Sequence, residues 1–246
     1  VQAVSDDPFA LGISLLSSVG ATRALELEGN CAFISVATPA SIKTEDYPLT
    51  APLFVYVPAR RLPKVAREFL RFVQSPQGQP FIAQAGFADQ AISRTDAEHQ
   101  GNRLANAIRA AGEEITLQDL QRMIETLHGT SRLSVSFRFE GGSSHLDAQS
   151  RSNIVMIARA FEEGLFDGDE ILFVGFSDSE GSAAANNRLS LQRAAAVRTA
   201  ILKEAVAADQ NRLNLKVEAF GEAMPMACDD TDWGRHVNRR VEIWQR

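Results

Sequence analysis

Residues Glu170–Phe176 (EILFVGF) are a nearly unbroken apolar run, and this run decides the fold class of the C-terminal half of the chain. Strands that are covered on both faces have this pattern, so the run predicts a buried β-strand. A polar loop, Ser177–Ala185, follows it, and the next stretch predicts a long helix over Asn186–Ala207. A buried strand, a loop and a helix in succession predict an α/β domain.

The segments on either side extend this pattern. Four apolar residues that alternate with polar ones predict a half-buried strand: Leu133, Val135, Phe137 and Phe139. A helix is predicted to start at Asp147 or Ser150, and two more strands are predicted at Leu215–Phe220 and Arg239–Trp244. The order β-α-β-α-β-β over residues 131–246 predicts a two-layer α/β domain with its helices stacked on one sheet.

The residues before this domain predict shorter elements. Residues 1–92 predict a mixed α/β segment with these parts: a helix-like stretch at Ala21–Leu27, strands at Cys31–Ala37 and Leu53–Val57, a helix from Pro63 to Ser75-Pro76, and a helix at Gln77–Ala85. Residues 93–130 predict two helices, the second capped by Thr116. We expect these two helices to form a connector between domains.

Composition and charge limit the class of protein. The chain has 246 residues, of which 45% are apolar and 23% charged, as in globular proteins of one or two domains. Its apolar runs fall far short of the roughly 18 residues of a membrane-spanning helix. The parts before and after the Thr130–Ser131 bond each carry a net charge of −3, so neither offers a basic surface. We therefore expect neither a membrane span nor a nucleic-acid partner.

The start of the chain and its two cysteines leave alternatives open. The chain begins at Val1 without a methionine, and residues 1–10 show no signal peptide, so either a leader was removed or the chain is a fragment of a longer protein. Cys31 and Cys228 could form a disulfide, belong to a pair broken by truncation, or be two buried free thiols. No other Cys or His stands at ligand spacing, so we expect no zinc site and no cofactor.

The clearest chemical pattern follows the predicted buried strand. Asp178 stands at the end of that strand, where ligands commonly bind in α/β domains. Asn186 and Arg193 are seven residues apart, which places both on one face of the predicted helix. A carboxylate and a guanidinium that converge suit a zwitterionic ligand. A surface ion pair and a helix capped by Asn186 would explain the same spacing.

Residues 131–246 resemble the OmpA-like (Pal-type) peptidoglycan-binding domain. The resemblance rests on five motifs in the family's order: Gly175–Asp178, Asn186–Ala194, Phe220-Gly221-Glu222 with Pro225, Gly234-Arg235, and Asn238–Glu242. The chain departs from the family's pattern at Ser177, where Thr is usual, and at Phe176, where His or Tyr is more frequent. Ser177 keeps the hydroxyl group, whereas Phe176 could alter the rim of the pocket.

The resemblance implies a function and assigns residues to it. Asp178 and Arg193 would bind the diaminopimelate end of a peptidoglycan stem peptide, and Asn186 would hydrogen-bond the same ligand. Arg239 would lie near the pocket, although an ordinary charged strand residue explains it equally well. The resemblance also implies a non-catalytic protein of the periplasm that is associated with the cell wall.

Residues 1–92 resemble the later part of the phosphate-type periplasmic solute-binding proteins. Three stretches carry this resemblance: Asp7–Gly12, Ile42–Leu49 and Phe69–Gly78. The Ser-Gly-Thr-type anion-binding motifs of that family come earlier than this part and are not found in the chain, so no ligand residues can be assigned. The resemblance implies a partial solute-binding domain, with a small anion as a candidate partner of the full-length protein.

Catalytic motifs are not found around the four histidines, which are His99, His128, His145 and His236. None stands in a His-Glu-x-x-His or Gly-x-Ser-x-Gly motif, and no glycine loop is followed by the Lys-Ser/Thr of a phosphate-binding loop. We therefore predict a protein that is not an enzyme and that holds a solute-binding-type domain at the cell wall. Two alternatives are an anion receptor for transport or sensing that uses the wall contact as a tether, and an enzyme acting on the cell wall.

Overall fold

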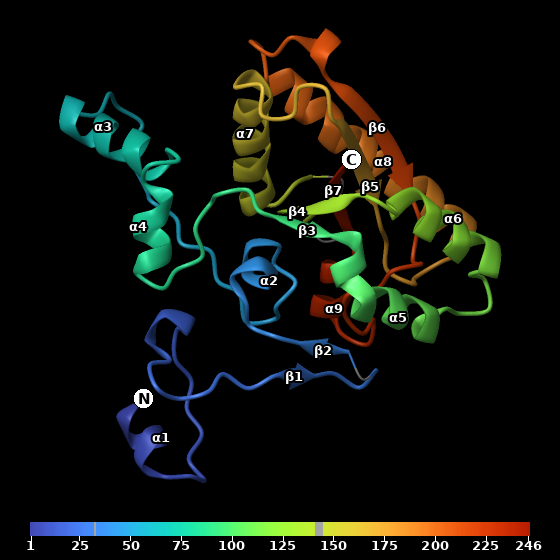
Figure 1. Cartoon of the computed structure of the whole chain (residues 1–246), viewed down its shortest axis with the longest axis horizontal. Coiled ribbons are helices and arrows are strands. Elements are labelled where there is room, and N and C mark those ends of the chain that lie inside the picture. The colour runs from blue at the N-terminus through green and yellow to red at the C-terminus, as the bar shows by residue number, and fades with distance from the viewer. Residues whose placement is uncertain (32, 141–144) are drawn as a thin grey trace. The chain divides into compact units, whose positions relative to one another are not determined.

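The computed structural model describes residues 1–31, 33–140 and 145–246, and the chain divides into two compact units (Figure 1). Unit 1 comprises Val1–Leu27 and Ile34–Ile92, and unit 2 comprises Glu28–Phe33 and Ser93–Arg246. In the described part of the chain, no helix combines the length and the apolar character needed to cross a bilayer.

Unit 2 is built on a five-stranded sheet with the order β3-β4-β7-β5-β6. Its strands are β3 (Arg94–Asp96), β4 (Ser131–Arg138), β5 (Glu170–Gly175), β6 (Asn214–Ala219) and β7 (Arg240–Gln245). β5 and β6 run parallel, whereas the other neighbouring strands are antiparallel. The three C-terminal strands lie within one residue of their predicted bounds, and the predicted combination of helix and sheet is confirmed.

Two long helices cover one face of this sheet (Figure 1). They are α7 (Ala148–Glu162) and α8 (Ala183–Glu204), which pack against each other and against the strands. The side chain of Asp147 accepts a hydrogen bond from the Ser150 N–H and so caps α7. α8 starts three residues before its predicted start because Ser182 Oγ accepts from the Ala185 N–H and caps the helix there.

Helices α5 (Gly101–Ala110) and α6 (Leu117–Leu127), after the 3₁₀ turn η2 (Ala97–Gln100), cover the opposite face of the sheet. Side chains alternate between the faces of a strand, and Gly175 of β5 faces α8. The other face of β5 forms one buried cluster with α6, through Leu172, Val174, Leu120, Met123 and Leu127. Residues 93–130 therefore belong to unit 2, which differs from the expected connector because the apolar face of α6 is buried against the sheet.

Strand β4 is buried on both faces, so the prediction of a half-buried strand was wrong. Ser136 and Arg138 on its polar face are both only 1% exposed. They pair in register with Glu242 and Arg240 of β7, and these charged side chains are fully buried as well. Protein contacts cover this polar face: Ser136 Oγ accepts from Arg132 Nη2, and Arg138 Nη1 donates to the carbonyl oxygen of Val237.

The segment between β6 and β7 contains two features that the sequence left unassigned or open. A short helix, α9 (Asp232–Asn238), precedes β7, and Thr231 Oγ1 caps it by accepting from the Gly234 N–H at 3.0 Å. Cys31 and Cys228 form a disulfide with a Cα–Cα distance of 5.7 Å. Of the three alternatives for the cysteines, the structure therefore shows the first. A 3₁₀ turn, η3 (Gln210–Arg212), lies before β6.

The elements of unit 1 are short: α1 (Gln2–Asp6), η1 (Leu16–Ser18), β2 (Ile34–Ser35), α2 (Pro39–Lys43), α3 (Lys64–Val73) and α4 (Gln79–Gln84). The two-residue strand β1 (Leu27–Glu28) begins at the last residue of the first stretch of unit 1 and ends at the first residue of unit 2. α3 and α4 lie within the two helices predicted there, and β2 lies within the predicted strand Cys31–Ala37. Leu53–Val57 forms no strand and Ala21–Leu27 forms no helix, contrary to prediction. Short elements are marginal without packing partners, and the side chains of Leu53–Val57 are exposed.

Glycine at position 175 sets the distance between β5 and α8. A Cβ atom at this position would lie 2.1 Å from the backbone oxygen of Ser190 in α8. We expect Gly175→Ala to lower the free energy of unfolding by about 1–3 kcal/mol, as other overpacking substitutions do, when measured by urea denaturation. Gly112→Ala is the control, because a Cβ there meets no atom within 4 Å. Equal effects of the two substitutions would contradict the steric argument.

Candidate functional site

The sheet order brings Asp178 and Arg239 together. Asp178 follows β5 and Arg239 immediately precedes β7, and these two strands are antiparallel neighbours with Gly175 opposite Val241. The Phe176 N–H donates to the Arg240 carbonyl oxygen at 2.8 Å and so extends this pairing toward the site. Arg239 Nη1 then donates to Asp178 Oδ2 at 2.5 Å. The two side chains are only 18% and 9% exposed, which makes this a largely buried ion pair.

Arg193 lies beside this ion pair on α8. The residue is 7% exposed, and its guanidinium carbon lies 5.1 Å from the centre of the Phe139 ring. Burial lowers the pKa of Arg193 and the positive charge of Arg239 lowers it further, whereas the charge of Asp178 acts in the opposite direction. Within residues 1–31, 33–140 and 145–246, Nε and Nη1 of Arg193 find no hydrogen-bond acceptor. The site thus holds two buried N–H donors that an anionic group could bind.

Asn186 lies on the same helix, two turns before Arg193. It is 4% exposed, and its Nδ2 donates to Glu222 Oε2 at 2.5 Å. Glu222 follows β6, so this hydrogen bond joins the start of α8 to the loop after that strand. The side-chain amide of Asn186 therefore already donates a hydrogen bond within the protein.

A pocket of about 670 Å³ opens beside the ion pair. It is lined by Ser179, Glu180, Asp229, Asp232, Arg235, His236 and Arg239. Of the predicted site residues, Arg239 lines this pocket. Asp178 does not line it but accepts the hydrogen bond from Arg239. The sequence analysis did not assign the other lining residues to the site, although Gly234-Arg235 stood among the family motifs.

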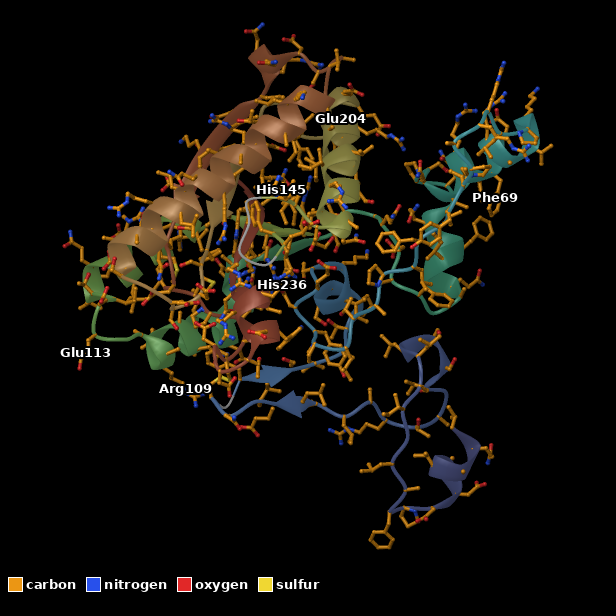
Figure 2. The ribbon with its side chains drawn as sticks, turned by 180° about the vertical axis from the view of Figure 1, so that it is seen from behind. Phe69, Arg109, Glu113, His145, Glu204 and His236 are labelled. Atoms are coloured by element: carbon orange, nitrogen blue, oxygen red, sulfur yellow. A yellow bond between two sulfur atoms is a disulfide. The ribbon has the colours of Figure 1, made fainter. Side chains whose placement is uncertain are left out.

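The charges around this pocket include both signs. Glu180, Asp229 and Asp232 are acidic, and Arg235 and Arg239 are basic. His236, labelled on α9 in Figure 2, has a lowered pKa because of burial and, secondarily, the positive charge of Arg138. We therefore take its imidazole as neutral at pH 7. Carboxylates and guanidiniums around one cavity suit a ligand that carries both amino and carboxylate groups.

The described residues contain no cluster of three or more His, Cys, Asp or Glu side chains able to hold a metal ion. The side chains of the site offer hydrogen bonds and ion pairs. These groups can bind and orient a charged ligand.

The residues of this site lie in a part of the chain that is similar to a known protein family. Residues 138–239 match the model of the OmpA family, so the chain contains an OmpA-like domain. Outer membrane protein A of Bordetella avium is 34% identical over 105 residues, which are 43% of this chain and 51% of that protein. Outer-membrane lipoprotein YfiB of Pseudomonas aeruginosa is 32% identical over 111 residues, which are 45% of this chain and 62% of that protein.

A solved structure is also similar over the same part. The peptidoglycan-associated lipoprotein from Burkholderia pseudomallei has 22% sequence identity and a TM-score of 0.39, and the match covers 45% of this chain and 89% of that chain. The match to each of the two curated relatives spans less than two thirds of the relative's length. The family match does not extend into residues 1–92.

Proposed function

We propose that the OmpA-like domain binds peptidoglycan of the diaminopimelate type and does not cleave it. The observation that carries this proposal is the buried guanidinium of Arg193, with two N–H groups directed to no acceptor in the described chain, beside the Asp178–Arg239 ion pair. Buried donors without acceptors cost about 1–3 kcal/mol each, so an anionic ligand would be bound there with a substantial gain.

The chemistry of diaminopimelate fits this arrangement. The end of its side chain carries an ammonium and a carboxylate group on one carbon. Arg193 can bind the carboxylate with its planar set of N–H donors, and Asp178 can accept from the ammonium. Arg239 would share Asp178 with the ligand and supply a second positive charge. Asn186 supports the site from behind through Glu222, so we assign it a positioning role rather than the ligand contact expected from the sequence.

Sacculi of the diaminopimelate type should bind the whole chain, and added salt should weaken this binding. Arg239 lines the open pocket, where salt screens its charge, whereas salt screens the buried guanidinium of Arg193 less. Sacculi with lysine in place of diaminopimelate are the control, because lysine lacks the second carboxylate. We expect at least about tenfold weaker binding to them, as for the loss of a hydrogen bond to a charged group. Equal binding to both sacculi in a pull-down would contradict the proposal.

The relatives support a location in the cell envelope. They are an outer membrane protein and an outer-membrane lipoprotein. We therefore propose the periplasm as the compartment in which this domain meets the cell wall. An enzyme acting on the cell wall is the competing function, and incubation with purified muropeptides decides it. New products would overturn the proposal of a non-catalytic protein.

We propose in addition that residues 1–92 are part of a solute-binding-type domain, and that this chain by itself does not bind phosphate tightly. A buried oxyanion needs several donors, whereas the buried polar residues of unit 1 are Thr44, Asp46 and Gln79, one of them acidic. Lys43 is already paired with Asp89 at 2.8 Å. Calorimetry with inorganic phosphate should show no micromolar binding. Micromolar binding would favour the anion-receptor alternative.

A further inference from the structure

The carboxylate of Asp229 accepts hydrogen bonds from two residues that are neighbours of the Asp178–Arg239 ion pair in the chain. Its Oδ2 accepts from the backbone N–H of Ser179 at 2.7 Å, and its Oδ1 accepts from Asn238 Nδ2 at 2.5 Å. Ser179 is the neighbour of Asp178 in the chain, and Asn238 is the neighbour of Arg239. One side chain therefore connects the two backbone segments that carry the ion pair.

Asn238 also connects Asp229 to its own loop. The Asn238 side chain is fully buried, and its Oδ1 accepts from the N–H groups of Met226 and Ala227 at 2.7 and 3.1 Å. Its Nδ2 donates to the Ala227 carbonyl oxygen at 2.8 Å as well as to Asp229. The loop before α9 is thereby fixed to the last residue of α9.

A covalent link anchors the same loop at the residue next to Asp229. Cys228 is joined by the disulfide to Cys31, 197 residues earlier in the chain (Figure 2). Two further hydrogen bonds reinforce the link: the Cys31 N–H donates to Cys228 Sγ at 3.0 Å, and Asn30 Nδ2 donates to Asp230 Oδ2 at 2.7 Å. On the other side, the Cys228 carbonyl oxygen lies where a Cβ at Gly234 would be, only 1.7 Å away. Cys228 thus packs between Gly29 and Cys31 on one side and α9 on the other.

We infer that Asp229, anchored by the Cys31–Cys228 disulfide, is a positioning residue for the ligand site. The disulfide restricts the backbone at Cys228, which precedes Asp229. The hydrogen bonds of Asp229 then restrict the backbone at Ser179 and the side chain of Asn238. Asp178 and Arg239 are thereby held at the separation that the ligand requires before it binds. A preorganised site loses less conformational entropy on binding and therefore binds more tightly. This inference rests on the proposed function for its effect on affinity, but not for its effect on the free protein.

The experiment compares three variants of the whole chain with the unaltered protein. The first is Cys31→Ser with Cys228→Ser, the second is Asp229→Asn, and the third combines them. Asp230→Asn is the matched control, because it removes a charge from the same loop without touching Ser179 or Asn238, and because its amide oxygen can still accept the single hydrogen bond from Asn30. The probe is a stem tripeptide that ends in meso-diaminopimelate, measured by calorimetry. Hydrogen exchange of the Ser179 amide, measured without ligand, reports on the backbone next to Asp178.

The cysteine variant and Asp229→Asn should each weaken binding about three- to tenfold, the loss expected for one or two hydrogen bonds. The Ser179 amide should exchange faster in both variants, and both should still unfold cooperatively. Because the two changes act through one contact, the combined variant should bind no more weakly than Asp229→Asn alone. Asp230→Asn should leave affinity and exchange unchanged.

Three results would overturn the inference. They are an unchanged Ser179 exchange rate in the cysteine variant, additive losses in the combined variant, and global loss of structure when the disulfide is removed, which would show a general rather than a local role. Failure of the unaltered protein to bind the tripeptide would instead contradict the proposed function. In that case the Ser179 exchange rates still decide whether the disulfide and Asp229 fix this segment.

Discussion

Arg193→Ala should weaken binding of a diaminopimelate-containing stem peptide by about 10- to 100-fold, the usual cost of losing a hydrogen-bonded charged partner. Arg188→Ala should change binding by less than about twofold, because Arg188 is exposed and lies about 200° around α8 from Asn186. Arg193→Lys keeps the charge but loses the planar set of donors, so its affinity should fall between these two. Calorimetry with the tripeptide measures all three.

Stability separates a ligand-binding role of Arg193 from a structural one. Since Nε and Nη1 have no acceptor in the described part of the protein, Arg193→Ala removes buried donors that destabilise the free protein. Its contact with the Phe139 ring is the main interaction lost, worth about 0.5–2 kcal/mol. Affinity should therefore fall much more than stability. A large loss of stability with unchanged affinity would show that Arg193 supports the fold and does not bind the ligand.

The residues of this site were predictable where one element carried the signal. Strand end and helical period indicated Asp178, Asn186 and Arg193 as candidates, although a surface ion pair and a helix cap explained the same spacing, and only the family resemblance favoured a ligand role. Arg239 stood in a family motif, but its pairing with Asp178 depends on β7 lying next to β5. That neighbourhood is a property of the sheet order, which local periodicity does not contain.

The errors of the sequence analysis share a physical cause. The alternation in β4 predicts a solvent-facing side, but Ser136 and Arg138 are covered by contacts from distant segments. Leu53–Val57 has strand-forming residues, but it pairs with no strand among the described residues and its side chains are exposed. The role of Asp229 was also invisible, because two adjacent aspartates in a loop usually face water, whereas this one accepts hydrogen bonds from Ser179 and Asn238. In each case, tertiary contacts decide what the local pattern leaves open.

Glu242→Gln should lower the free energy of unfolding of unit 2 by about 3–5 kcal/mol, as breaking a buried ion pair does. Glu242 is fully buried, and three guanidinium groups approach its Oε1: Arg103 at 2.5 Å, Arg240 at 2.7 Å and Arg132 at 3.1 Å. Its Oε2 accepts from Trp244 Nε1 at 3.0 Å. Glutamine keeps the shape but removes the shared negative charge among three positive ones.

The same network ties α5 to the sheet. Arg103 belongs to α5, whereas Arg132 and Arg240 belong to β4 and β7, so Glu242 is the point at which the helix and two strands meet. Removing the Glu242 carboxylate should increase local opening of residues 93–130, which cover that face of the sheet. It should also lower the global free energy of unfolding. Faster hydrogen exchange in α5 and α6 than in α7 would report this local effect.

The dependence of stability on pH gives an independent check. The charges of Arg103, Arg132 and Arg240 outweigh the effect of burial and hold the pKa of Glu242 far below its usual range. The stabilisation from the ionised group is therefore complete above the unfolded pKa of about 4.3 and is lost as the pH falls from there toward the folded pKa. Urea unfolding at several pH values should show this loss in the unaltered protein but not in Glu242→Gln, so the two stabilities should converge in acid.

Glu218→Gln is the control, because Glu218 is also a strand glutamate that pairs with an arginine. Its partner, Arg122, lies 3.3 Å away, but the two side chains are 33% and 45% exposed, respectively. Exposed ion pairs contribute about 0–1 kcal/mol, so this substitution should have a small effect at pH 7. If Glu242→Gln proved as mild as Glu218→Gln, the three arginines would be compensated by other groups, and Glu242 would not be the residue that fixes α5 to the sheet.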